Sequence, residues 1–263
     1  MKLTSLYSGS SGNCLLLVQN ETKLLIDAGL SGSKIQAMLK IAGVEPCELS
    51  AILITHEHND HISGAGILSR RFDLPVYANE RTMAAMRSCL GKVKEENLRV
   101  FENRAPFFIG DVEIRPFCSC HDAADPVGYR FNDGKSALAV ATDIGVVTEE
   151  IAQNLLGCKA VFLEANHDVQ MLKTGSYPYY LKQRILSDHG HLSNESAGDF
   201  CCALIQRGAE KIVLGHLSQH NNTPLTALNT VIEIAAENGM KRGRDFLLGV
   251  ASRDGISEEE LIV

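Results

Sequence analysis

Residues 51–61, with the sequence AILITHEHNDH, join a short apolar segment to three histidines and an aspartate. The apolar part predicts a buried strand. Alternation along an extended chain places His56 and His58 on one face, where both can bind one ion. Asp60 and His61 follow where the chain turns into a helix, and they can reach a second ion. The alternative, a surface patch of histidines, accounts poorly for such density in a chain with nine histidines. Imidazole and carboxylate suit zinc, manganese or iron.

The composition is that of an ordinary globular protein, with 45% hydrophobic and 22% charged residues among 263. We expect one domain that spans residues 1–263. No apolar run approaches the ~18 residues of a membrane helix, and the N-terminus lacks the apolar region of a signal peptide. The eight cysteines form no CxxC pair. We therefore expect a cytoplasmic protein with reduced cysteines and no membrane association.

The formal net charge of −7 argues against a general nucleic-acid coat protein, which would be basic. Two bound divalent ions would add about four positive charges to the site. An acidic chain can therefore still present a locally positive cleft to a phosphodiester.

The pattern of apolar runs and turn residues predicts an α/β protein. Strands are expected at residues 3–7, 14–18, 23–27, 51–55, 74–77, 112–118, 127–131, 136–141, 160–164, 211–214 and 246–248. Helices are expected at residues 31–43, 62–71, 80–90, 149–156, 194–207 and 225–237. Strands followed by strand–helix alternation occur twice. This repetition indicates two αβ halves packed sheet to sheet.

Four further predicted strands end in a residue that can bind a metal or support a ligand. These residues are Asp27, His121, Asp143 and His216. Each one alone could be a turn residue. Taken together, such residues at converging strand ends are what a metal site between two sheets requires.

These motifs resemble those of the metallo-β-lactamase superfamily, whose signature is HxHxDH with a series of Asp and His residues at strand ends. The resemblance spans residues 3–250 and implies a four-layer αββα sandwich with a dinuclear site at one sheet edge. It implies two divalent ions, zinc or manganese with iron as an alternative. His56, His58 and His121 would bind one ion, Asp60, His61 and His216 the other, and Asp143 would bridge them. Asp27 would orient the histidine loop, and Asp60 would also orient the nucleophile.

Two loops in the second half narrow the expected chemistry. The segments around Glu164 and His191 resemble those of tRNA 3′-processing and related phosphodiesterases, where a Glu and a His form a relay. Such a relay implies that His191 protonates the leaving oxygen, which accelerates the departure of a poor alkoxide by roughly 10²–10⁴-fold. In the alternative, Glu164 merely ends a strand and His191 precedes an ordinary helix cap.

Together with the segments around His121 and His191, residues 8–13, SGSSGN, and residues 214–222, LGHLSQHNN, resemble one branch of small bacterial proteins in this superfamily. That branch implies a cytoplasmic 5′→3′ DNA exonuclease linked to a cell-wall-regulating two-component system. Asp143 and His216 are 73 residues apart, which leaves no room for a large cap domain between them. A DNA end is therefore expected in preference to a long structured RNA.

Substrate contacts are predicted less directly. Ser8 and Asn13 could form an active-site wall, and Lys173, Lys182, Arg184 and Arg253 could contact phosphate. Two other functions stay open: a phosphodiesterase for cyclic nucleotides or cyclic phosphates, and a non-catalytic metal-binding partner of a two-component signalling system. A homodimer is an open alternative to a monomer.

Overall fold

The computed structural model describes residues 1–263 and contains two seven-stranded sheets. The first sheet has the order β14-β1-β2-β3-β4-β5-β6, and the second has the order β13-β12-β11-β10-β9-β8-β7. The strands of the first sheet are β1 (Lys2–Gly9), β2 (Gly12–Gln19), β3 (Thr22–Ile26), β4 (Ala51–Leu53), β5 (Val76–Asn79), β6 (Leu98–Phe101) and β14 (Glu260–Ile262). Those of the second are β7 (Phe107–Ile109), β8 (Val112–Cys118), β9 (Val127–Asn132), β10 (Ala137–Ala141), β11 (Ala160–Glu164), β12 (Lys211–Gly215) and β13 (Leu247–Val250).

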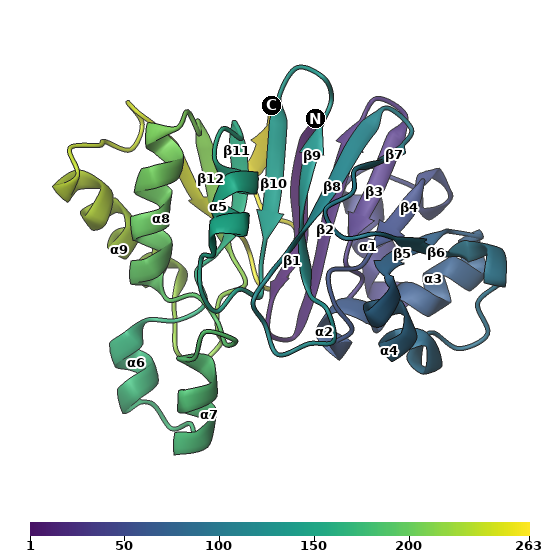
Figure 1. Cartoon of the computed structure of the whole chain (residues 1–263), viewed down its shortest axis with the longest axis horizontal. Helices are drawn as coiled ribbons and strands as arrows, with labels where there is room; N and C mark the ends of the chain where they lie inside the picture. Colours follow the sequence, from purple (N-terminus) through teal and green to yellow (C-terminus); the bar gives the residue numbers. More distant parts are fainter.

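Helices cover the outer faces of the two sheets (Figure 1). The first half supplies α1 (Gly32–Ile41), α2 (Asn59–Ile62), α3 (Ala65–Phe72) and α4 (Glu80–Leu90). The second half supplies α5 (Glu149–Leu155), α6 (Val169–Thr174), α7 (Tyr179–Ile185), α8 (Asn194–Gln206) and α9 (Pro224–Glu237). Two short 3₁₀ turns lie at Pro46–Glu48 and Glu95–Asn97. None of the helices combines the length and apolar character that crossing a membrane requires.

Three buried apolar layers hold the four structural layers together. One cluster lies between the sheets and includes Leu24 from β3 and Phe131 from β9. A second lies between the first sheet and its helices, with Leu39 of α1 in it. The third lies beneath α5, α8 and α9 and includes Val231. Burial of these faces is the main driving force for the arrangement, and the predicted αββα sandwich is confirmed.

Strand direction brings the ends of many strands to one edge. Strands β3 to β6 run parallel to one another, and so do β10 to β13. Because parallel strands place their carboxyl ends at the same edge, loops far apart in sequence meet there. The αβ crossovers therefore position residues from both halves of the chain at a single site.

The observed elements differ from the predicted ones in a few places. The helix predicted at residues 62–71 is mainly α3, which is separated at Gly64 from the preceding short helix α2. The N–H of Gly64 donates to the carbonyl of Ala28 at 2.7 Å. Residues 177–184, which contain three tyrosines and for which no helix or strand was predicted, are mostly helix α7. Strands β6, β7 and β14 and helix α6 were not predicted. Each has six residues or fewer, which is too short for a clear periodic pattern.

Candidate metal centre

The histidine loop follows β4 and is held against the end of β3. The N–H of Ala28 donates to the carbonyl of His61 at 2.7 Å, and the N–H of Gly29 donates to Asn13 at 2.8 Å. A Cβ atom on Gly29 would lie 1.6 Å from the carbonyl oxygen of Asp60. Only glycine therefore permits this approach between the end of β3 and the histidine loop.

The Asp27 carboxylate is fully used within the protein. Its Oδ1 accepts a hydrogen bond from the N–H of Thr55 at 2.8 Å. Its Oδ2 accepts from the Thr55 hydroxyl at 2.9 Å and lies 2.7 Å from Nδ1 of His61. With both oxygens engaged, Asp27 fixes the ring of His61 with its Nε2 directed toward the site, where the amide of Asn13 lies 3.1 Å away. Thr55 was not singled out from the sequence, although it immediately precedes His56.

One group of possible ligands consists of His56, His58 and His121, whose ligand atoms lie within 4.8 Å of one another. Nε2 of His56 is 3.0 Å from Nδ1 of His58. Nδ1 of His121 donates to the carbonyl of Gly190 at 3.0 Å, which leaves its Nε2 available. A carbonyl or carboxylate on the outer nitrogen is the usual way in which a metal-binding histidine is oriented.

A second group consists of Asp60, His61 and His216, again within 4.8 Å. Nε2 of His61 is 3.7 Å from Oδ2 of Asp60. Nε2 of His216 is buried and has no hydrogen-bond partner in the protein. Burial of an unpaired ring nitrogen is costly unless another ligand satisfies it, so this atom fits a metal ion.

Asp143 lies between the two groups. Its Oδ2 is 3.3 Å from Nε2 of His61, and its Oδ1 is 3.6 Å from Nε2 of His121. The Oδ2 atom is buried without a hydrogen-bond partner. Ligand atoms about 2.0–2.2 Å from one tetrahedral ion are roughly 3.3–3.6 Å apart, so the separations here fit shared ions. The donor set therefore fits divalent metal binding, with Asp143 close to possible ligands from both groups.

Three of these strand-end residues adopt a left-handed backbone conformation. The φ angles are +60° at Asp27, +55° at Asp143 and +56° at His216. This conformation is uncommon for residues other than glycine and persists where surrounding contacts enforce it. The N–H of His216 donates to the hydroxyl of Ser8 at 2.8 Å, and its carbonyl accepts from Asn166 at 2.9 Å. The turn at His216 is thus held from both sides.

Glu164 links the centre to His191. Its Oε1 is 2.8 Å from Nδ1 of His191 and 2.8 Å from Nδ1 of His216. Its Oε2 accepts from the N–H of Ile144 at 2.8 Å. The Glu164 side chain is 0% exposed, whereas the His191 side chain is 20% exposed. His191 is therefore the member of the pair that a substrate can reach. The contact between Glu164 and His216 was not foreseen from the sequence.

The buried charges perturb the pKa values of the histidines in different directions. Burial by itself lowers the pKa of His61, but the charges of Asp27 and Asp143 outweigh it and raise the pKa to about 10. Burial also lowers the pKa of His216, and the charge of Asp143 outweighs it and raises that pKa to about 9. For His56, burial lowers the pKa well below its usual value. Before metal binds, His61 and His216 therefore carry protons that an ion must displace.

The two buried carboxylates of the second sheet stay ionised. Burial raises the pKa of Asp143, but the neighbouring histidines, His216 first among them, hold it well below its usual value. Burial likewise raises the pKa of Glu164, and the charge of His191 and its hydrogen bond outweigh burial and lower that pKa. A negative Glu164 can stabilise a protonated His191.

The predicted substrate contacts have different surroundings. Ser8 and Asn13 are buried, and the amide of Asn13 lies between the carbonyl of Gly9 and Nε2 of His61. The ammonium of Lys182 donates to the carbonyls of two residues at the end of α6. These internal contacts argue against direct substrate binding by Ser8, Asn13 and Lys182. Arg184 is more than half exposed and is paired with Asp122, which was not singled out from the sequence.

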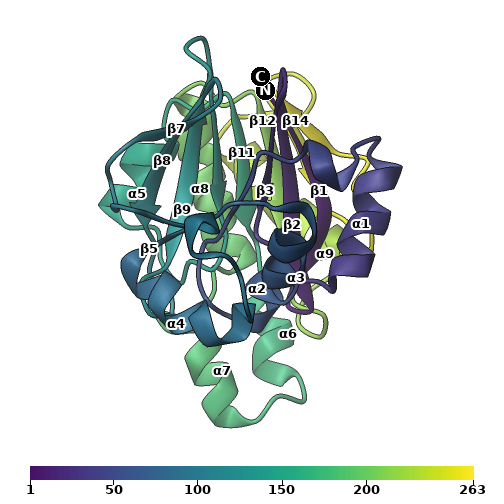
Figure 2. The same ribbon diagram turned by 90° about the vertical axis from the view of Figure 1, so that its right-hand side faces the viewer.

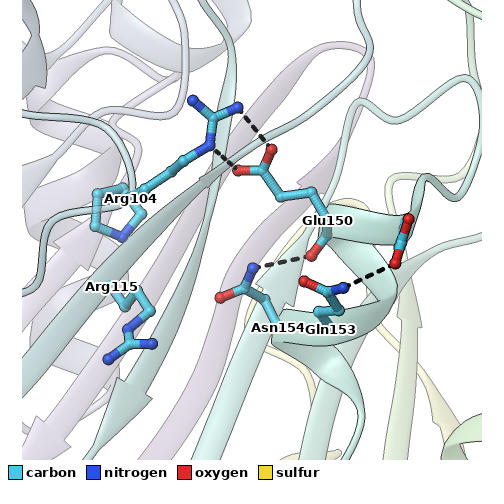
Figure 3. Close-up of a pocket in the computed structure, with 7 residues that line it drawn as sticks. Arg104, Arg115, Glu150, Gln153 and Asn154 are labelled. Atoms are coloured by element: carbon cyan, nitrogen blue, oxygen red, sulfur yellow. Dashed lines mark hydrogen bonds and ion pairs between the residues drawn. The ribbon is translucent and has the colours of Figure 1, made fainter.

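A cavity of about 160 Å³ adjoins the candidate centre. His121, Asp122, Arg184 and His191 lie in its wall. A second hollow, of about 400 Å³, lies elsewhere, beside α5 and β8. Figure 3 shows that Arg104 is paired there with Glu150, through hydrogen bonds of 3.0 and 2.8 Å. None of the side-chain groups that could hold a metal lies in that hollow, so we place the chemistry at the first cavity.

Comparison with known families agrees with the fold and the histidine motif. A family model described as Beta-lactamase superfamily domain matches residues 22–217. The chain belongs to the metallo-β-lactamase superfamily, as its motifs predicted.

Two relatives are similar over nearly their whole length. Exodeoxyribonuclease WalJ of Streptococcus pneumoniae serotype 2 (strain D39) is 42% identical over 255 residues, which cover 96% of this chain and 95% of that protein. Exodeoxyribonuclease YycJ of Bacillus anthracis is 42% identical over 241 residues, which cover 92% and 91%. Among solved structures, the metallo-β-lactamase fold protein YhfI from Bacillus subtilis superposes with a TM-score of 0.73 and 17% identity. That superposition covers 97% of this chain and 98% of YhfI, and it supports the fold.

Proposed function

We propose that the chain is a metal-dependent exodeoxyribonuclease that hydrolyses phosphodiester bonds at DNA ends in the 5′→3′ direction. The relatives named exodeoxyribonuclease, at 42% identity over most of the chain, support a DNA substrate. One structural observation carries the proposal: the Glu164–His191 pair lies beside the metal-ligand groups. The rings of His191 and His121 are 5.0 Å apart, and those of His191 and His216 are 5.3 Å apart.

The candidate centre would hold two divalent ions, zinc or manganese with iron as an alternative. His56, His58 and His121 would bind one ion, Asp60, His61 and His216 the other, and Asp143 both. When bound, such ions activate water at neutral pH and offset charge on the phosphate in the transition state. The buried, unpaired Nε2 of His216 and Oδ2 of Asp143 support this assignment.

The other side chains would orient the reactants and move protons. Asp60, whose carboxylate is 30% exposed, would accept a hydrogen bond from the attacking water. Nδ1 of His191 is held by Glu164, so its Nε2 can deliver a proton to the leaving oxygen. After that transfer His191 is neutral, and it regains a proton from solvent. Such general-acid catalysis contributes most where the leaving group is a poor alkoxide, as it is in DNA.

We infer that the protein acts in the cytoplasm. No further domain lies between Asp143 and His216 that could grip a long folded RNA, which favours a DNA end as substrate. Sedimentation analysis distinguishes a monomer from the alternative homodimer.

The test compares two substrates with the same metal-loaded protein. One is a duplex labelled at either end, and the other is a chromogenic phosphodiester, each with zinc or manganese. We expect release of mononucleotides from the duplex. Chemical blocking of the 5′ or the 3′ end, one at a time, shows from which end cleavage begins. Turnover of only the small ester would overturn the exonuclease proposal and favour a small-molecule phosphodiesterase.

A second test addresses the non-catalytic alternative. His61→Ala and Asp143→Ala should abolish metal binding at one or both positions. Cells that carry either variant in place of the natural protein should lose its function. Full cellular function with a metal-free variant would show that hydrolysis is not the role of the protein.

A further inference from the structure

A helical hairpin formed by α6 and α7 projects from the body of the protein beside the candidate centre. It hangs below the sheets in both Figure 1 and Figure 2. The hairpin is tied to the site at its base. The N–H of His191 donates to the carbonyl of Ile185 at the end of α7, at 3.0 Å. The N–H of Asp168, at the start of α6, donates to Asn221 at 2.9 Å.

The hairpin exposes large aromatic side chains. Three of the six tyrosines of the chain lie between positions 177 and 180. Tyr179 is 77% exposed and Tyr180 is 74% exposed, more than any other large hydrophobic side chain of the chain. Neither side chain forms a hydrogen bond or an aromatic contact within the protein. Two adjacent exposed tyrosines contribute nothing evident to folding, so they are available to a ligand.

The charge of the hairpin differs from that of the whole chain. Residues 169–185 contain three basic residues, Lys173, Lys182 and Arg184, and no acidic residue. The chain as a whole has a formal charge of −7. Arg184 is paired with Asp122, and the ammonium of Lys182 donates to carbonyls within the hairpin. Lys173 is the basic side chain that has no such contact. An aromatic projection that carries no acidic residue suits a polyanion with flat rings.

The hairpin is continuous with the cavity at the candidate centre. Tyr177, Leu181 and Arg184 line that cavity from the hairpin side, while His121 and His191 line it from the other. Tyr180 is three residues beyond Tyr177, which limits the separation of their Cα atoms to about 11 Å. A DNA strand whose end lies in the cavity would therefore reach the exposed tyrosines after a few nucleotides.

We propose that the α6–α7 hairpin binds the nucleotides next to the scissile bond as single-stranded DNA, with Tyr179 and Tyr180 stacking on bases. This inference rests on the proposed exonuclease function and specifies how its substrate is held. Stacking on aromatic side chains is tolerant of sequence because every base has a flat face. A small phosphodiester would have no base in reach of the hairpin. A two-fold contact between hairpins of two copies would bring like charges together, which favours DNA as the occupant.

The test uses the metal-loaded full chain with the double variant Tyr179→Ala/Tyr180→Ala. Binding is measured by fluorescence anisotropy with a labelled single strand that has phosphorothioate linkages, and turnover with both a natural strand and a chromogenic phosphodiester. Loss of one stacked base should weaken binding about 5- to 150-fold, so we expect at least a tenfold rise in Kd for the strand. Turnover of the small ester should stay within about twofold.

Two matched variants isolate the interaction. Tyr179→Phe/Tyr180→Phe keeps the rings and should keep the wild-type affinity within about twofold. Phe108→Ala removes an equally exposed ring from β7, paired with the start of β8 and away from the centre, and should change nothing. Because no charge is removed, the salt dependence of binding should keep its slope in the tyrosine variants.

Several outcomes would overturn the inference. An unchanged Kd in the alanine variant would do so, as would an equal loss in the phenylalanine variant. Loss of small-ester turnover would indicate damage to the centre instead of a lost strand contact. A shift from dimer to monomer in sedimentation velocity, with DNA affinity unchanged, would assign the tyrosines to a contact between copies. A wild-type protein inactive on DNA but active on the ester would overturn the proposed function and this inference with it, whereas an active wild type with unaffected variants overturns the inference alone.

Discussion

The two halves of the molecule build the candidate centre in different ways. The first half supplies four possible ligands from one loop, His56 to His61, directly after β4. The second half supplies one residue from each of several separated segments, namely His121, Asp143, Glu164, His191 and His216. A single loop keeps its ligands together through local geometry, whereas dispersed residues depend on strand order. The first half therefore supplies possible metal ligands alone, whereas the second half supplies both possible ligands and the Glu164–His191 pair.

The largest expected effect comes from breaking the contact that joins the two halves. Asp143→Ala removes the carboxylate that approaches ligands from both sheets. We expect fewer than two ions per chain by mass spectrometry of metals, and a loss of activity of at least about a thousandfold, since metal ions supply several kcal/mol of transition-state stabilisation. Asp199→Ala, on the exposed surface of α8, is the control. Two retained ions and activity within tenfold of wild type would contradict the bridging position.

The second prediction separates proton transfer from metal binding within the second half. His191→Ala should slow DNA cleavage about 10²–10⁴-fold and leave the metal content unchanged. The loss should be smaller for an ester with a p-nitrophenolate leaving group, which leaves without a proton. His189→Ala, an exposed neighbour in the same loop, is the control. A loss of metal in His191→Ala would show that this residue is a ligand instead.

The companion variant Glu164→Gln sharpens that result, because Glu164 contacts both His191 and His216. It should reduce turnover as His191→Ala does and also weaken metal affinity, by about 10–100-fold for a residue that orients a ligand. If Glu164→Gln lost turnover but kept its metal affinity, the contact between Glu164 and His216 would not contribute to metal binding.

The third prediction concerns the support of the first-half loop. In Gly29→Ala, the added Cβ would collide with the carbonyl of Asp60, so the histidine loop must move. We expect a loss of about 1–3 kcal/mol in the free energy of unfolding of the metal-free protein, measured with urea. Gly255→Ala, whose Cβ would meet no atom within 4 Å, should stay within about 0.5 kcal/mol of wild type. Equal stability of the two variants would show that the loop position tolerates a side chain.

The last prediction concerns the pH dependence of metal binding, to which both halves contribute. The pKa values of His61 and His216 are raised, to about 10 and about 9. Below those values the rings are protonated and cannot bind, so a rise in pH should strengthen metal binding, by about tenfold per pH unit for each displaced proton. Calorimetry in buffers of different ionisation enthalpy, between about pH 6.5 and 8.5, counts the protons. A pH-independent affinity would contradict this charge state.

Most of the fold could be predicted from periodicity and turn residues. The apolar runs that became β8 and β11 and the amphipathic segment that became α4 were predicted with their observed bounds. The failures were short elements such as β6 and α6, where tertiary contacts outweigh local preference. The order of strands within the sheets could not be read locally, because it depends on pairing between distant segments.

The sequence by itself determined the histidine loop, since its ligands are neighbours and their spacing fixes their geometry. It also indicated which later Asp and His residues end strands. Only the tertiary structure decided that Glu164 contacts two histidines, that Ser8 supports the turn at His216, and that the tyrosine-rich segment stands as a hairpin beside the cavity. These contacts join residues that are 27 to 208 positions apart, so they exist only once both sheets have formed and their strand ends meet at one edge.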